Sequence, residues 1–240
     1  MVLAAAALDR RTDRMIAELD ARGYALSPTR LDDAALAELT ALFADWPGGC
    51  PGQRIDPART EGLSFVRRLC SDLNGAPGAD FRPVRAILFD KHDGANWALA
   101  WHQDRTIEVA ERRDTDGFGP WTVKQGRVHV APPVSLLERM RTVRFHLDPV
   151  DADNAPLLVS PGSHRLGLIP EAAIGDVVAR LGEAMCLADA GSVWFYHTLI
   201  LHASARSRPR RHRRVLQIDL SADALPGGLR WGADGEGRAS

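Results

Sequence analysis

The N-terminal third of the chain has apolar residues at helical spacing. In residues 4–22 apolar side chains recur every three or four positions, and Gly23 follows, a pattern typical of a helix that ends at a glycine. A second helix is predicted after Asp32, where leucines repeat on one face, and a third over about residues 60–74. We therefore expect a helical N-terminal part that covers about residues 1–80.

From Arg82 onward the period changes to two, because Val84, Ala86 and Leu88 alternate with other residues. A helix is predicted near residues 170–182. The other apolar runs are short and rich in β-branched and aromatic residues, and they predict strands at residues 141–147, 155–159, 192–196, 199–203 and 214–220. Helices first and many short strands later favour an antiparallel jelly roll, a cupin-like double-stranded β-helix with helices packed on one side.

The length and composition fit one domain over residues 1–240, with a jelly-roll core at about residues 81–221. The chain has 240 residues, of which 45% are hydrophobic, enough for one sizeable core. Residues 108–133 are polar, weakly periodic and contain Gly and Pro. We interpret this stretch as a long functional loop or lid.

The charges and cysteines exclude several classes of protein. The 30 Lys and Arg residues balance 31 Asp and Glu residues, and the net charge of −1 gives no attraction to nucleic acid. The three cysteines are widely spaced and odd in number, which argues against a disulfide framework and fits a reducing compartment. No stretch approaches the ~20 apolar residues of a membrane helix, and the N-terminus has no signal-peptide pattern. We expect a cytoplasmic protein with a small-molecule substrate and no membrane partner.

The first candidate for chemistry is His102-Gln103-Asp104, at the end of a β-like run. Residues i and i+2 of a strand point the same way, so His102 and Asp104 could converge on one ion. Two histidines and one carboxylate form the facial triad of non-haem Fe(II) oxygenases, which leaves other metal positions open. A His-x-Asp triplet alone is weak evidence, and a third ligand is required. Of the eight histidines only His102 and His202 have partners at ligand spacing, and the rest read as exposed or structural.

Several motifs downstream occur in a recognisable order. A glycine-led strand, residues 191–196, precedes His202-Ala-Ser204, and an arginine-rich turn and a further strand follow. With residues 88–91 and 157–164, this combination resembles the phytanoyl-CoA dioxygenase family of Fe(II)/2-oxoglutarate oxygenases over roughly residues 80–221. In that family an arginine eleven residues after the distal histidine binds the co-substrate carboxylate, and Arg213 stands there. The resemblance implies that His102, Asp104 and His202 bind iron.

The residue chemistry agrees with the role that the resemblance implies for Arg213. A bound 2-oxo acid needs a buried cation for its far carboxylate, and an arginine offers paired charge-assisted hydrogen bonds. Arg214 faces the other way if the strand is regular, whereas a bulge would exchange the two arginines. Side chains that could add contacts to the co-substrate or substrate are Ser204, Lys91, Asn96 and Arg144.

The resemblance implies an Fe(II)- and O2-dependent hydroxylase that converts 2-oxoglutarate to succinate and CO2. Two other interpretations stay open: a cupin-like metalloenzyme that does not use 2-oxoglutarate, and a catalytically silent small-molecule-binding protein on the same fold. A third alternative is a phosphate-binding patch, although it lacks the aromatic residues of a nucleic-acid platform. Its residues are Arg206, Arg208, Arg210, Arg211, Arg213 and Arg214.

Overall fold

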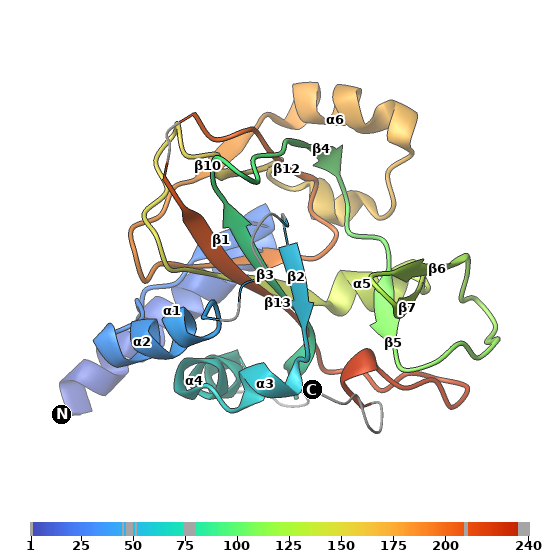
Figure 1. Ribbon diagram of the computed structural model, residues 1–240, viewed down its shortest axis with the longest axis horizontal. Coiled ribbons are helices and arrows are strands. Elements are labelled where there is room, and N and C mark those ends of the chain that lie inside the picture. Colours follow the sequence, from blue (N-terminus) through green and yellow to red (C-terminus); the bar gives the residue numbers. More distant parts are fainter. Residues whose placement is uncertain are drawn as a thin grey trace.

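The computed structural model describes residues 2–44, 46, 50, 52–73, 80–208 and 211–234 (Figure 1). Its largest element is an antiparallel six-stranded sheet in the order β1-β11-β8-β13-β3-β2. These strands are β1 (Tyr24–Leu26), β11 (Val193–His197), β8 (Arg141–His146), β13 (Arg213–Ser221), β3 (Arg82–Lys91) and β2 (Gly52–Ile55). Two of them, β1 and β2, come from the part of the chain expected to be helical.

A second, four-stranded sheet completes the jelly roll, in the order β10-β9-β12-β4. Its strands are β10 (Ala184–Cys186), β9 (Leu157–Val159), β12 (His202–Ser204) and β4 (Leu99–His102). Apolar residues from both sheets, among them Leu157, Val159 and Tyr196, form one buried cluster. The predicted fold class is thereby confirmed.

Alternation along the strands of the large sheet separates an apolar face from a polar one. On β3 and β13, Leu88 and Leu216 belong to a core that also contains side chains of the N-terminal helices. The alternate residues of the same strands, such as Arg85 and Gln217, point to the other face and line the interior of the jelly roll. One sheet thus carries both the main core and the wall of a polar cavity.

The helices α1, α2 and α4 lie together along the large sheet (Figure 1). Their ends have the expected chemistry: Gly23 adopts φ +87°, and the Asp32 side chain accepts a hydrogen bond from the Ala35 backbone N–H at 2.9 Å. The helices among the described residues are α1 (Val2–Arg22), α2 (Asp33–Ala41), α3 (Ala58–Glu61), α4 (Ser64–Leu73), α5 (Val134–Arg139) and α6 (Ile174–Leu181), with 3-10 turns at Ser163–Leu166, Glu171–Ala173 and Gly232–Asp234. No helix among the described residues is long and apolar enough to cross a membrane.

Two further expectations from the sequence are wrong. Residues 108–133 are not one long loop, because they hold most of a three-stranded sheet of β5 (Ile107–Val109), β7 (Arg127–Val130) and β6 (Trp121–Lys124). The strand predicted at residues 199–203 is shorter than expected, because β12 begins only at His202 and residues 199–201 belong to the connection before it. Leu199, Ile200 and Leu201 are fully buried in that connection, so burial rather than strand pairing explains the apolar run.

Candidate metal centre

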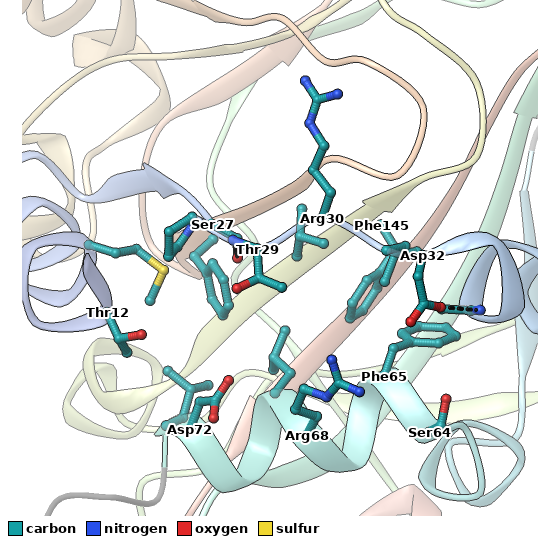
Figure 2. Close-up of a pocket in the computed structure, with 18 residues that line it drawn as sticks. Thr12, Ser27, Thr29, Arg30, Asp32, Ser64, Phe65, Arg68, Asp72 and Phe145 are labelled. Atoms are coloured by element: carbon teal, nitrogen blue, oxygen red, sulfur yellow. Dashed lines mark hydrogen bonds between the residues drawn. The ribbon is translucent and has the colours of Figure 1, made fainter. Parts of the chain in front are cut away.

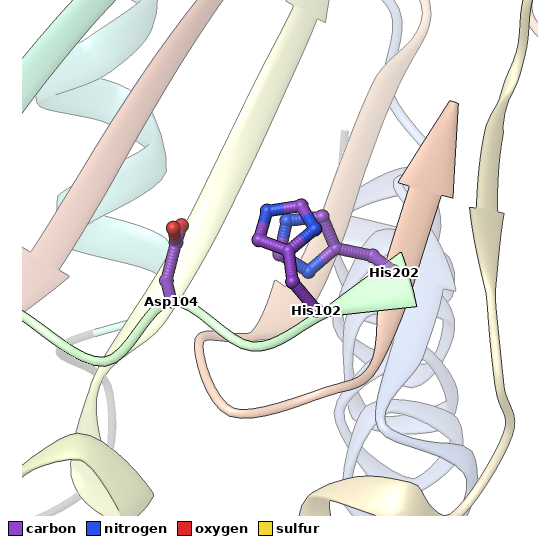
Figure 3. Close-up of side chains that lie close together, drawn as sticks. All are labelled: His102, Asp104 and His202. Atoms are coloured by element: carbon purple, nitrogen blue, oxygen red, sulfur yellow. The ribbon is translucent and has the colours of Figure 1, made fainter. Parts of the chain in front are cut away.

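Three potential metal ligands meet between β4 and β12 (Figure 3). His102 ends β4, His202 begins β12, and the antiparallel pairing sets these two residues directly opposite each other. Asp104 lies two residues beyond the end of β4 and not within the strand. One ligand atom from each of the three side chains lies within 4.8 Å of the others, a spacing that one metal ion can bridge.

The hydrogen bonds of the two histidines leave the metal-binding nitrogens free. Nδ1 of His102 lies 2.7 Å from the carbonyl oxygen of Ala100, and Nδ1 of His202 lies 3.0 Å from that of Ile200. Because a carbonyl can only accept, each Nδ1 carries a proton, and Nε2 is the ring nitrogen that is left for a metal. Burial, followed by the proximity of His102, lowers the pKa of His202 to about 4, so this ring is neutral near pH 7.

Asp104 is held by Arg85, which the sequence did not indicate as a site residue. Arg85 lies 3.0 Å from an Asp104 oxygen and 2.6 Å from an oxygen of Asp219, which also accepts a hydrogen bond from Thr142. Burial alone would raise the pKa of Asp104, but Arg85 and the two histidines hold it well below its usual range. The carboxylate is therefore charged and oriented by Arg85, as a metal ligand must be.

A cavity of about 300 Å³ adjoins the three candidate ligands. Among its described lining residues the acidic side chain is Asp104, whereas five are cationic: Arg54, Arg85, Lys124, Arg144 and Arg213. Apolar side chains, among them Phe89 and Trp97, complete the wall. Three of these cations, Arg85, Arg144 and Arg213, are buried, and the excess of positive charge favours an anionic ligand.

Arg213 lies at the cavity and Arg214 does not. Arg213 is 2% exposed, donates to the carbonyl of Ala155 and has an Nε without a partner among the described residues. Arg214 points away from the cavity and pairs with Asp148 at 2.7 Å. The strand is regular at this point, as the pairing of Arg213 with Lys91 and of Arg214 with Asp90 shows.

Two further cations surround Arg213. The Lys91 ammonium lies 3.1 Å from the Ser204 hydroxyl and 2.6 Å from the carbonyl of Ala205. Burial, with added repulsion from Arg213 and Arg144, lowers the pKa of Lys91 to about 7. Arg144 is buried, has no ion pair among the described residues, and its guanidinium lies 5.6 Å from the ring centre of Phe89.

The remaining sequence candidates lie elsewhere. Both ends of the Asn96 amide bond the backbone of Ser207, at 2.7 and 2.9 Å, so Asn96 anchors that segment and does not line the cavity. His129, one of the histidines that read as exposed or structural, is completely buried on β7. In the arginine-rich turn, Arg208 pairs with Asp153 at 3.1 Å and Arg211 pairs with Asp151, whereas Arg210 lies outside the described residues. These ion pairs neutralise positive charge that a phosphate-binding patch would need, which argues against that interpretation.

A second cavity, of about 70 Å³, lies on the helical face of the large sheet (Figure 2). Its floor includes Phe65 and Phe145, and its rim carries Arg68 and Asp72 from α4. None of the three candidate metal ligands lines it. The cavity lined by His102, Asp104 and His202 is therefore the candidate site, because it also has cations without an ion pair among the described residues.

The chain resembles known proteins in both sequence and fold. The model of the phytanoyl-CoA dioxygenase (PhyH) family matches residues 20–215. No curated protein matches the chain. Similar solved structures include the non-haem alpha-ketoglutarate-dependent epimerase SnoN from nogalamycin biosynthesis, which is 19% identical with a TM-score of 0.62 and covers 98% of this chain and 97% of its own.

Two other solved structures have the same fold. AviO1 from Streptomyces viridochromogenes Tue57 is 17% identical, with a TM-score of 0.60 over 90% of this chain and 96% of its own. EctD from S. alaskensis, solved with 2-oxoglutarate and 5-hydroxyectoine, is 16% identical, with a TM-score of 0.64 over 87% of this chain and 75% of its own. At these identities the likeness concerns the fold.

Proposed function

This chain belongs to the phytanoyl-CoA dioxygenase family of Fe(II)/2-oxoglutarate-dependent oxygenases, and on that premise we propose that it hydroxylates a C–H bond of a small molecule. The observation that carries the proposal is the meeting of His102, Asp104 and His202 beside a cation-lined cavity. In this proposal the three side chains hold the iron. Their donor set of two imidazoles and one carboxylate suits Fe(II) and leaves positions for other ligands.

The protonation of the three side chains supports this assignment. Nε2 of His102 and of His202 is free of hydrogen bonds to described residues, and Asp104 is kept ionised by Arg85. Arg85 fixes the carboxylate from behind through one oxygen and leaves the other oxygen available. The His202 ring is already neutral near neutral pH, so it need not lose a proton before metal binds.

The co-substrate would be bound by the cations at the inner end of the cavity. Arg213 would pair with the far carboxylate of 2-oxoglutarate, while Ser204 lines the cavity and accepts a hydrogen bond from Lys91. When bound, iron supplies the redox chemistry that couples conversion of 2-oxoglutarate and O2 to succinate and CO2 with insertion of one oxygen atom into a C–H bond. Phe89 and Trp97 line the cavity and would keep water from the reacting carbon.

A turnover assay with Fe(II) tests the proposed function. We expect the protein with Fe(II), O2 and 2-oxoglutarate labelled in the carboxyl group next to the keto group to release labelled CO2 and an equal amount of succinate. Without the primary substrate this release should be slow. A chelator should stop the reaction, and Fe(II) should restore it. A metalloenzyme that does not use 2-oxoglutarate, or a silent binding protein, would form no more succinate than Fe(II) does in the absence of protein.

A proton should accompany binding of 2-oxoglutarate through Lys91. The pKa of Lys91 is about 7 because of burial beside Arg213 and Arg144. A carboxylate bound at Arg213 favours the charged ammonium and raises this pKa. At pH 8 binding should therefore take up as much as about one proton, and at pH 6, where Lys91 is already charged, almost none.

Calorimetric titration in two buffers of different ionisation enthalpy measures this uptake. The variant Lys91→Arg, which stays charged at both pH values, should bind 2-oxoglutarate at pH 8 without it. Equal proton uptake in the parent and in Lys91→Arg would contradict the assignment to Lys91.

A further inference from the structure

The cavity carries more cationic groups than 2-oxoglutarate can engage. Arg54 and Arg144 lie on one cross-strand row of the large sheet, because Arg54 pairs with Ile87, Ile87 with Gln217, and Gln217 with Arg144. Three strand spacings separate their backbones, about 14 Å. Arg54 thus lies at the β2 edge, away from the end of the cavity formed by Arg213 and Arg144.

Lys124 joins Arg54 at this edge. It ends β6, and the next residue, Gln125, donates a hydrogen bond from Nε2 to the carbonyl of Gly52 at 3.3 Å. This contact ties the β6–β7 turn to β2, two residues from Arg54. Both Arg54 and Lys124 line the cavity that the candidate metal ligands line.

No acidic group among the described residues forms an ion pair with either side chain. Arg54 is half-buried and its Nε is buried without a partner, while the Lys124 ammonium donates to the neutral Thr106 hydroxyl at 2.9 Å. The nearest carboxylates serve other cations: Asp104 bonds Arg85. Glu108 bonds Arg127 at 2.6 Å.

The result is a half-buried arginine and an exposed lysine at one edge of the cavity, neither of which forms an ion pair with an acidic side chain among the described residues. Burial is the main cause that lowers the pKa of both Arg54 and Lys124, and Arg85 adds repulsion to each. A bound anion at this edge would pair with both cations and would give the buried Nε of Arg54 a hydrogen-bond acceptor. Ile87, Phe89, Trp97 and Leu99 give the same cavity an apolar wall.

We propose that Arg54 and Lys124 bind the anionic group of the primary substrate, a carboxylate or a phosphate monoester attached to an apolar body. The apolar wall accepts the body, and the anchored charge holds the substrate beside His102, Asp104 and His202. The identification of the bound molecule as the substrate rests on the proposed function, whereas the anion site itself does not.

The test uses four probes with one phenylalkyl body. They are 4-phenylbutanoate and its neutral amide, and 3-phenylpropyl phosphate and its parent alcohol. Each is titrated calorimetrically into protein loaded with Fe(II) and 2-oxoglutarate without O2. We expect the carboxylate, the phosphate or both to bind at least about tenfold more tightly than the neutral counterpart, the loss typical of one charge-assisted contact.

Variants assign the anion binding to this edge. Arg54→Gln and Lys124→Gln should each remove most of the preference for the charged probe, and Arg59→Gln, an exposed arginine on α3 outside the cavity, should not. Binding of the acid without the phosphate, or the reverse, identifies the anionic group. Equal binding of charged and neutral probes, an unchanged preference in both cavity variants, or no binding of any probe would overturn the proposal.

The same samples separate this inference from the proposed function. Affinity for 2-oxoglutarate is measured first in every variant and should not change in Arg54→Gln. If 2-oxoglutarate fails to bind or yields no succinate while the charged probes still bind through Arg54, the proposed function fails and the anion site stands. If 2-oxoglutarate turns over normally but charge preference is absent, only the anion site fails.

Discussion

Replacing His202 with alanine is expected to abolish Fe(II)-dependent succinate formation while the chain stays folded. The substitution removes one of three candidate ligands and leaves an imidazole and a carboxylate, which hold Fe(II) far more weakly. The apolar cores stay intact, because His202 belongs to none of the clusters that join the sheets and helices. Loss of about 100-fold or more in Fe(II) affinity is expected, beyond what loss of a supporting residue causes.

The measurements are Fe(II) binding at equilibrium, succinate formation and thermal unfolding of the metal-free protein. His212→Ala is the matched control, since His212 is an exposed histidine directly before β13 that contacts Asp90 and does not line the cavity. Succinate formation by His202→Ala at the rate of this control would show that the iron is held elsewhere.

The sequence was most informative where strand geometry fixes what a spacing means. A period of two in β3 and β13 separates the two faces of the sheet, and it predicts that Arg213 and Arg214 point in opposite directions, as they do. The fold class could be predicted for the same reason, because helices and then short strands leave few ways to cover one core.

The sequence was least informative where a residue acts through a partner far along the chain. Arg85 contacts Asp104, which is 19 residues away in the sequence, and Asp219, which is 134 residues away, and no local pattern indicates either contact. Arg54 and Lys124 line the same cavity although they are far apart in the sequence, and a hydrogen bond from the β6–β7 turn to β2 joins their two segments. That hairpin was itself missed, since the polar, Gly- and Pro-containing stretch around it hides strands of three or four residues.

The last prediction concerns Arg213, whose replacement by alanine should raise the dissociation constant of 2-oxoglutarate by at least about thirtyfold. Truncating one partner of a buried, hydrogen-bonded charge pair costs about 2 to 5 kcal/mol, because the other charge is left buried without a partner. Arg213 is almost completely buried, so solvent would not compensate the carboxylate. Calorimetric titration with 2-oxoglutarate measures the change.

Arg208→Ala is the control that separates a co-substrate site from a general basic surface. Arg208 is 84% exposed in its side chain and pairs with Asp153, so its removal should leave 2-oxoglutarate binding unchanged. Raising the salt concentration should weaken binding only slightly, because a buried pair is poorly screened. Equal, salt-sensitive losses in Arg213→Ala and Arg208→Ala would instead favour the phosphate-binding patch, in which exposed arginines act together on an anion at the surface.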